Sequence, residues 1–180
     1  MAKGRAFLPI ACAIAALGFS VSAQPALAAS PEARVKAAYL FKLASFVRWP
    51  DDVARRSEFR LCVAGNNEVA GALRDLTRGQ RLIGSPVTVA TLDPSRASTA
   101  RFCQIVFVAR GRDSARTLLA AADGLPILTV ADRNGGTDGG VIDFVERDGK
   151  VRFAINRTLA RRQGLELSSK LLDIALAIEP

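Results

Sequence analysis

The 180-residue sequence contains no histidine. Histidine is the commonest general base and the commonest metal ligand in enzymes, so its absence excludes nucleophile systems of the Ser-His and Cys-His types. Aromatic residues make up only 6% of the chain, with a single Trp and a single Tyr. The composition therefore argues against a histidine-dependent enzyme, and no cofactor is predicted.

The other chemistry-bearing residues do not form a recognisable site. The segment 134–140, NGGTDGG, lacks the spacing and the lysine of a phosphate-binding P-loop, and we interpret it as a loop before a strand. Asp132, Asp138 and Asp143 do not have the spacing of an EF-hand calcium loop. Residues 168–170, Ser-Ser-Lys, are typical of a helix cap and first turn rather than a Ser-Lys dyad. The sequence thus predicts neither a catalytic nor a metal site.

The first 28 residues have the features of a secretory signal peptide. Lys3 and Arg5 form a positive segment, residues 6–19 form an apolar segment, and residues 26–28 form an Ala-x-Ala cleavage site. Cleavage there would leave a mature chain that starts at Ala29. A retained membrane anchor is the alternative, because residues 6–23 carry no charge. The remainder, about 150 residues, is long enough for one domain with a substantial core.

Cysteine is scarce, and only Cys62 and Cys103 lie beyond the leader. Both fall in apolar, strand-like segments, and an even number of cysteines in an exported protein favours a disulfide. A bridge between them would close a loop of about 40 residues, which the chain-entropy model values at roughly 4 kcal/mol. Two buried free thiols are the alternative.

The chain is strongly basic, with 25 Lys and Arg residues against 17 Asp and Glu residues. Nucleic acid is not predicted as a partner, because the leader directs the chain out of the cytoplasm and basic and aromatic residues do not interleave. A solvated, arginine-rich surface is the simplest interpretation. An acidic partner surface and anionic lipid headgroups stay open.

Short apolar segments alternate with helical patterns along the chain. This alternation predicts a single-domain α/β sandwich with a mostly parallel sheet covered by helices, followed by a C-terminal β-hairpin and helices. The predicted hairpin turns at residues 148–149, Asp-Gly. Two short helices follow, one that ends at Gly164 and one capped by Ser168. The predicted strands cover residues 59–65, 81–92, 104–110 and 126–132, the second of them interrupted by Gly84 and Pro86. The predicted helices cover residues 66–77 and 113–123.

An amphipathic helix is predicted for residues 31–49, with Ser30 as its N-cap and Pro50 as its stop. The face expected to pack on the core carries Val35, Tyr39, Leu40, Leu43, Phe46 and Val47. Phe41 falls on the opposite face, where a contact with a loop and a contact with another protein are both open. Phe41 and Trp49 are the candidate partner-binding residues.

Several motifs together carry a family resemblance over about residues 33–177. They are VKAAYLFKLASFVRWP, LCVAG, CQIVFVA, ILTVAD and GKVRFAINRTLARRQGLELSSKLLDIA. The chain resembles the YfiR-like family of small periplasmic α/β proteins, whose best-understood members repress an inner-membrane diguanylate cyclase through its periplasmic sensor domain. The resemblance implies a disulfide between Cys62 and Cys103, with a redox-sensitive role in some members. Some relatives have a second cysteine pair near the C-terminal hairpin, whereas this chain has no cysteine after Cys103.

These observations predict a periplasmic, non-enzymatic regulator, with residues 29–180 as one YfiR-like domain. Its partner would be the periplasmic domain of a diguanylate cyclase or of a sensor kinase. A small-ligand-binding module is the alternative, with Arg152 or Asn156 near its pocket because they lie towards the end of a predicted strand. A homodimer stays open.

Overall fold

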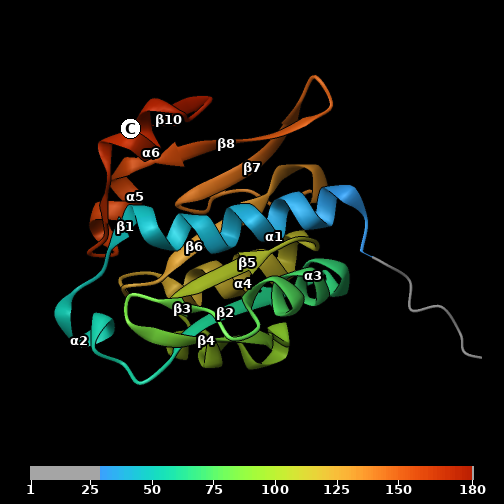
Figure 1. Ribbon diagram of the computed structural model, residues 1–180. Coiled ribbons are helices and arrows are strands. Elements are labelled where there is room, and N and C mark those ends of the chain that lie inside the picture. The colour runs from blue at the N-terminus through green and yellow to red at the C-terminus, as the bar shows by residue number, and fades with distance from the viewer. Residues whose placement is uncertain (1–28, 180) are drawn as a thin grey trace, which may run out of the picture.

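An eight-stranded sheet forms the centre of the computed structural model, which describes residues 29–179 (Figure 1). The predicted signal peptide, residues 1–28, lies outside the described residues. Five neighbouring strands, β4, β2, β5, β6 and β7, run parallel to one another, which confirms the predicted mostly parallel sheet. In spatial order the strands are β10 (Ala177–Glu179), β8 (Lys150–Asn156), β7 (Ile142–Arg147), β6 (Leu128–Asp132), β5 (Ile105–Val108), β2 (Phe59–Ala64), β4 (Ser85–Thr91) and β3 (Arg81–Leu82).

Helices cover both faces of this sheet, as predicted. Helices α1 and α3 pack on one face, and α4 with the 3-10 segment η2 packs on the other (Figure 1). None of the helices within residues 29–179 is long and apolar enough to span a bilayer. The helical segments are α1 (Pro31–Leu43), η1 (Ala44–Phe46), α2 (Asp51–Ala54), α3 (Asn67–Thr77), η2 (Pro94–Phe102), α4 (Arg112–Ala122), η3 (Arg133–Gly135), α5 (Arg157–Arg162) and α6 (Ser169–Asp173).

The core has two layers, one on each face of the sheet. Because successive side chains of a strand point to opposite faces, Leu61 and Val63 of β2 pack with α1 and α3, whereas Cys62 and Ala64 pack with η2 and α4. This burial on both sides explains why the central strands are continuous apolar runs rather than alternating ones.

Helix α1 buries part of the predicted face, since Leu40 and Leu43 are buried as expected, but the face is shifted at its N-terminal end. Val35, expected inside, is 43% exposed, whereas Ala37, expected outside, is buried. Small residues along one side allow α1 to lie close beside α3. Leu43 is buried as predicted, and Tyr39 is half-buried with its ring 5.9 Å from the ring of Phe153. The buried residues of α1 are Ala33, Lys36, Ala37, Leu40 and Leu43.

Helix α1 is also shorter than predicted. It ends at Leu43 rather than at Trp49, and η1 leads into the two-residue strand β1 (Val47–Arg48). Strand β1 pairs with β9 (Glu166–Leu167) in a small second sheet. The β-branched Val47 gains a strand partner there, which competes with continuation of the helix.

Two further segments differ from the prediction. The interruption predicted at Gly84 is a tight turn that makes residues 81–92 a hairpin of β3 and β4, with positive φ values of 51° at Ile83 and 79° at Gly84, whereas Pro86 lies within β4. Helix α6 begins after the predicted cap, Ser168, but ends at Asp173. The chain then returns to the sheet as β10, parallel to β8. The predicted hairpin of β7 and β8 is confirmed, with its turn at residues 148–149.

Candidate functional site

Cys62 and Cys103 are joined by a disulfide, in agreement with the prediction. Cys62 lies in β2, and Cys103 follows η2 just before β5. Their Cα atoms are 6.0 Å apart, within the usual range, and both residues are 1% exposed. The bridge therefore ties η2 to the centre of the sheet from within the core.

The two predicted partner-binding residues do not form an exposed pair. Trp49 is only 4% exposed, and its ring stands edge-on to that of Phe59 at a centroid distance of 5.3 Å. The expectation that Trp49 is a surface residue is wrong, because the chain leaves the helical path after Leu43 and carries the indole into the core. Phe41 is half-buried and packs against the edge of the same core layer.

The two predicted ligand-binding residues lie in different settings. Asn156 is the N-cap of α5, where its Oδ1 accepts a hydrogen bond from the amide of Leu159 at 2.7 Å. Arg152 is exposed and lines a groove of about 660 Å³ between α1 and the β7–β8 hairpin. Val35 and Tyr39 form an apolar wall of this groove, and Asn156 is not part of it. The structure thus brings Arg152, but not Asn156, to a concave surface.

A polar crevice of about 770 Å³, which the sequence did not predict, lies where β2, β5 and β6 end. Here α3 leaves towards one face of the sheet and α4 towards the other, an arrangement that often forms ligand sites in parallel sheets. Glycines bring the loops together at this edge, because a side chain on Gly135 would overlap the carbonyl of Ala109. The crevice is lined by residues from the end of β6, from the segments that follow β2, β5 and β6, from α1, from the start of α3 and from β7, including Glu32, Lys36, Asn66, Glu68, Arg110, Asp132 and Glu146.

A buried ion pair lies at the base of this crevice. The Lys36 Nζ is 2.5 Å from Asp132 Oδ2 and 2.5 Å from Glu32 Oε1, and the Lys36 and Asp132 side chains are each 5% exposed. Burial alone would lower the pKa of Lys36, but hydrogen bonds and charge from Asp132 and Glu32 outweigh it and raise this pKa. Asp132 Oδ1 has no hydrogen-bond partner among the described residues. At the crevice rim, hydrogen bonding from Ser30 lowers the pKa of Glu68.

A second charged cluster joins the β6–β7 loop to the C-terminal strand. Arg133 Nη2 lies 3.0 Å from Asp143 Oδ2 and 2.8 Å from Glu179 Oε1. Asp143 Oδ1 also accepts a hydrogen bond from the amide of Gly140 at 2.9 Å. The hydrogen bond to Glu179 is the main cause of a raised pKa for Arg133. Asp143 therefore has a structural partner in Arg133. Within residues 29–179, no group of three or more side chains is placed to hold a metal ion.

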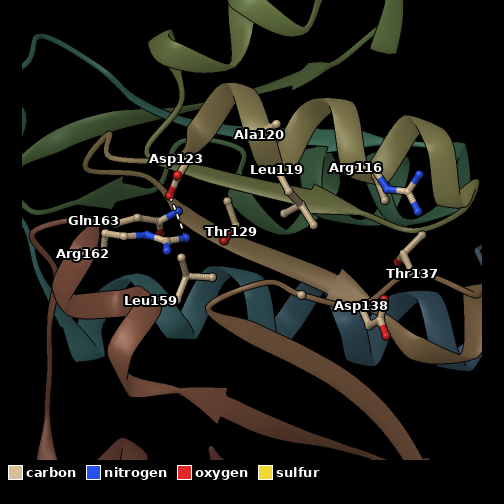
Figure 2. Close-up of a pocket in the computed structure, with 12 residues that line it drawn as sticks. Arg116, Leu119, Ala120, Asp123, Thr129, Thr137, Asp138, Leu159, Arg162 and Gln163 are labelled. Carbon is tan, nitrogen blue, oxygen red and sulfur yellow. Dashed lines mark ion pairs between the residues drawn. The ribbon is translucent and has the colours of Figure 1, made fainter. Parts of the chain in front are cut away.

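A third cavity, of about 510 Å³, lies between α4 and α5 (Figure 2). Figure 2 shows Arg162 and Asp123 pointing toward one another across it, and their charged atoms are 2.8 Å apart. Gln163 is 2% exposed, and its Oε1 has no partner within the described part of the chain. Thr129 is fully buried, and its hydroxyl accepts a hydrogen bond from the amide of Val141 at 3.0 Å. This cavity offers polar contacts for binding, without a nucleophile and base pair.

The comparisons with known proteins give a family. A family model described as YfiR/HmsC-like matches residues 33–176, which is most of the chain. The protein belongs to the YfiR/HmsC-like family. This family is known for regulating diguanylate cyclases.

The other comparisons add less. No curated protein matches the chain. Among solved structures, it is similar to a "conserved domain protein" from Vibrio cholerae O1 biovar El Tor strain N16961, at 12% identity and a TM-score of 0.49. The match covers 83% of this chain and 60% of that one, so the chain spans less than two thirds of that protein. A likeness at this level says nothing about function.

Proposed function

We propose that the protein is a periplasmic, non-enzymatic regulator that represses an inner-membrane diguanylate cyclase by binding its periplasmic sensor domain. The match to the YfiR/HmsC-like family over residues 33–176 carries this proposal. The signal-peptide features of residues 1–28 support export, and the lack of histidine argues against histidine-based catalysis. The disulfide between Cys62 and Cys103 is the group through which the redox state of the periplasm would reach the regulator.

Repression requires that the protein bind the inactive state of the cyclase more tightly than the active state. A shift from about 99% active to about 1% active needs a difference of about 5.5 kcal/mol in binding free energy. An interface of about 1,600 Å² is large enough to supply this difference when its contacts exist in one state only. The regulator can therefore act by binding alone, and no reaction on its surface is needed.

Cross-linking in the intact periplasm tests the partner. The tagged protein, cross-linked in living cells and purified under denaturing conditions, should carry a membrane protein with a periplasmic domain and a cytoplasmic cyclase domain. A periplasmic protein of similar size and charge, tagged in the same way, is the control. Recovery of periplasmic or outer-membrane proteins alone would contradict the proposal.

A small-ligand-binding module is the second candidate, and the polar crevice beside Lys36 and Arg110 favours it. A ligand that binds only the folded state adds about 2.7 kcal/mol of stability at a concentration of 100 Kd. A thermal-shift screen of amino acids and nucleotides would then show a clear rise in melting temperature, which Arg110→Ala should reduce. This result without a membrane partner would favour the module.

A further inference from the structure

The exposed large apolar residues gather at the C-terminal end of the chain. Of seven such residues among those the structure describes, three lie within five positions, namely Ile174, Leu176 and Ile178, which are 59%, 44% and 47% exposed. They lie between the end of α6 and the middle of β10: Ile174 is the C-cap of α6, Leu176 lies just before β10, and Ile178 lies within it. We call these three residues the apolar strip. An exposed cluster of this kind marks an interaction surface more often than a scatter of single residues does.

One residue of the apolar strip, Ile178, lies in the three-residue edge strand β10, Leu176 immediately precedes this strand, and Ile174 is the C-cap of α6. Strand β10 pairs only with β8, so the backbone on its other side has no strand partner within the described residues. An unprotected edge is a template for another extended segment, which adds hydrogen bonds along the backbone. The opposite end of the sheet is the two-residue strand β3, which is shorter.

A small apolar hollow lies beside the strip. It has a volume of about 200 Å³ and lies where α5, β9 and α6 meet. Leu172 lines it, and Ile174 follows only two positions later, while α5 contacts β10 directly. Figure 1 shows α5, α6, β8 and β10 gathered at this end of the molecule. The apolar part of its lining consists of Ala160, Leu165, Leu167 and Leu172.

Cations border this surface. Arg157 and Arg161 line the hollow, and Lys170 lies one helical turn before Ile174. All three are exposed, and none has an ion pair within residues 29–179. Two acidic residues are close by: Glu166, which also lines the hollow and lies 3.6 Å from Arg48, and Asp173, which has no ion pair among the described residues. The surface therefore combines apolar contacts with a local excess of positive charge. Its occupant should carry apolar and acidic side chains.

Resting on the proposed function, we infer that an extended segment of the cyclase's periplasmic domain, with apolar and acidic side chains, adds to β10. Its apolar side chains contact the apolar strip and the hollow, and its carboxylates contact Arg157 and Arg161. A lipid bilayer fits less well, because the unpaired backbone of a sheet edge has no partners in hydrocarbon. A second copy fits less well, because two mature chains repel one another: without Lys3 and Arg5 of the leader, each has 23 basic and 17 acidic residues.

The test uses two matched pairs of variants expressed in the deletion strain. Leu176→Asp introduces charge into the apolar strip, and Leu76→Asp makes the same change at a residue of similar exposure, 42% against 44%, in α3. Arg161→Glu reverses a charge at the hollow, and Arg74→Glu reverses one on α3. Leu176→Asp and Arg161→Glu should restore less than a tenth of the repression. Leu76→Asp and Arg74→Glu should restore it within twofold, at equal periplasmic amounts of oxidised protein.

A photo-reactive residue at position 178 gives a readout that does not depend on cyclic di-GMP. It should cross-link to a membrane protein, and the same group at position 76 should not. If position 178 cross-links to a membrane protein but deletion of the gene leaves the cyclic di-GMP concentration unchanged, the docking surface is supported and the cyclase is rejected as the partner. If Leu176→Asp represses as strongly as the wild type and position 178 gives no cross-link, the docking surface is rejected, while the cyclase remains the proposed partner.

Two other occupants are distinguished in the same series. A cross-link from position 178 to a second copy would overturn the inference in favour of a homodimer. Sedimentation of the purified oxidised protein with phosphatidylglycerol vesicles but not phosphatidylcholine vesicles, lost in Leu176→Asp, would overturn it in favour of a bilayer. Wild-type protein that stays in the supernatant with both kinds of vesicle agrees with a peptide occupant.

Discussion

Lys36 shows how much one buried charge depends on its partners. Lys36→Met should lower the free energy of unfolding by about 3–5 kcal/mol, because the carboxylate of Asp132 would stay buried without its cation. Urea denaturation at neutral pH measures the change. The double variant Lys36→Met/Asp132→Leu, which removes both charges, should recover most of it. If the free energy of unfolding of Lys36→Met lies within about 1 kcal/mol of the wild-type value, water reaches Asp132 freely.

Because the pKa of Lys36 is raised, we expect the free energy of unfolding to depend on pH in the alkaline range. Because this pKa is higher in the folded than in the unfolded state, the contribution of Lys36 is complete below the unfolded value, about 10.4. It is lost as the pH rises through the folded pKa. The free energy of unfolding of the wild type, relative to that of the double variant, should be constant from about pH 7 to 9 and should decrease above about pH 10.5.

Leu43 and Phe41 differ in burial although they lie two positions apart. Leu43 is 2% exposed, so Leu43→Ala should destabilise the isolated protein by about 2–5 kcal/mol. Phe41 is half-buried, and Phe41→Ala should cost less. Thermal and urea unfolding of both variants checks the order. An equal loss would make Phe41 a core residue and would end its candidacy as a partner contact.

Trp49 is unsuitable as a probe of partner binding. Its burial means that Trp49→Ala should destabilise the fold by about 3–5 kcal/mol, so lost regulation in that variant would not identify a contact. The sequence could not show this, because Trp49 follows a helical pattern that the pairing of β1 with β9 interrupts. The ion pair of Lys36 was also not predictable, because its partner Asp132 lies 96 positions away.

At the scale of the elements, the disulfide is the clearest source of stability that the sequence predicts. The double variant Cys62→Ala/Cys103→Ala should lose about 4 kcal/mol, because a bridge across 41 positions restricts the unfolded chain. The same loss should follow reduction of the wild type. Urea denaturation with and without reductant measures both. If reduction destabilises the wild type and leaves the double variant unchanged, the effect belongs to the bridge.

The elements also show where sequence patterns are enough and where they fail. Apolar runs bounded by turns predicted the central strands, and Ser168 caps α6 as predicted. The pattern of large apolar residues placed Leu40 and Leu43 of α1 correctly in the core. It misplaced Val35 and Ala37, because close packing of α1 beside α3 favours a small residue on the buried side. The alternation of apolar residues with alanine in residues 174–178 was a signal for β10 that a helical interpretation obscured.

At the scale of the whole molecule, the proposed function requires a domain that acts by binding alone. The sandwich holds a disulfide within its core, and its apolar strip lies in and just before the edge strand β10, away from α1. The two candidate sites lie in different parts of the sheet. The polar crevice lies where the parallel strands end, whereas the proposed docking surface lies at β10.

The concentration of cyclic di-GMP in a strain that lacks the gene decides whether the protein represses a diguanylate cyclase. We expect a higher concentration than in the parent, with stronger surface attachment and less swimming, and a return to the parental level when the wild-type gene is restored. The reason is that a cyclase without its periplasmic repressor stays in its active state. An unchanged concentration in the deletion strain, under oxidising and reducing conditions alike, would contradict the proposed function.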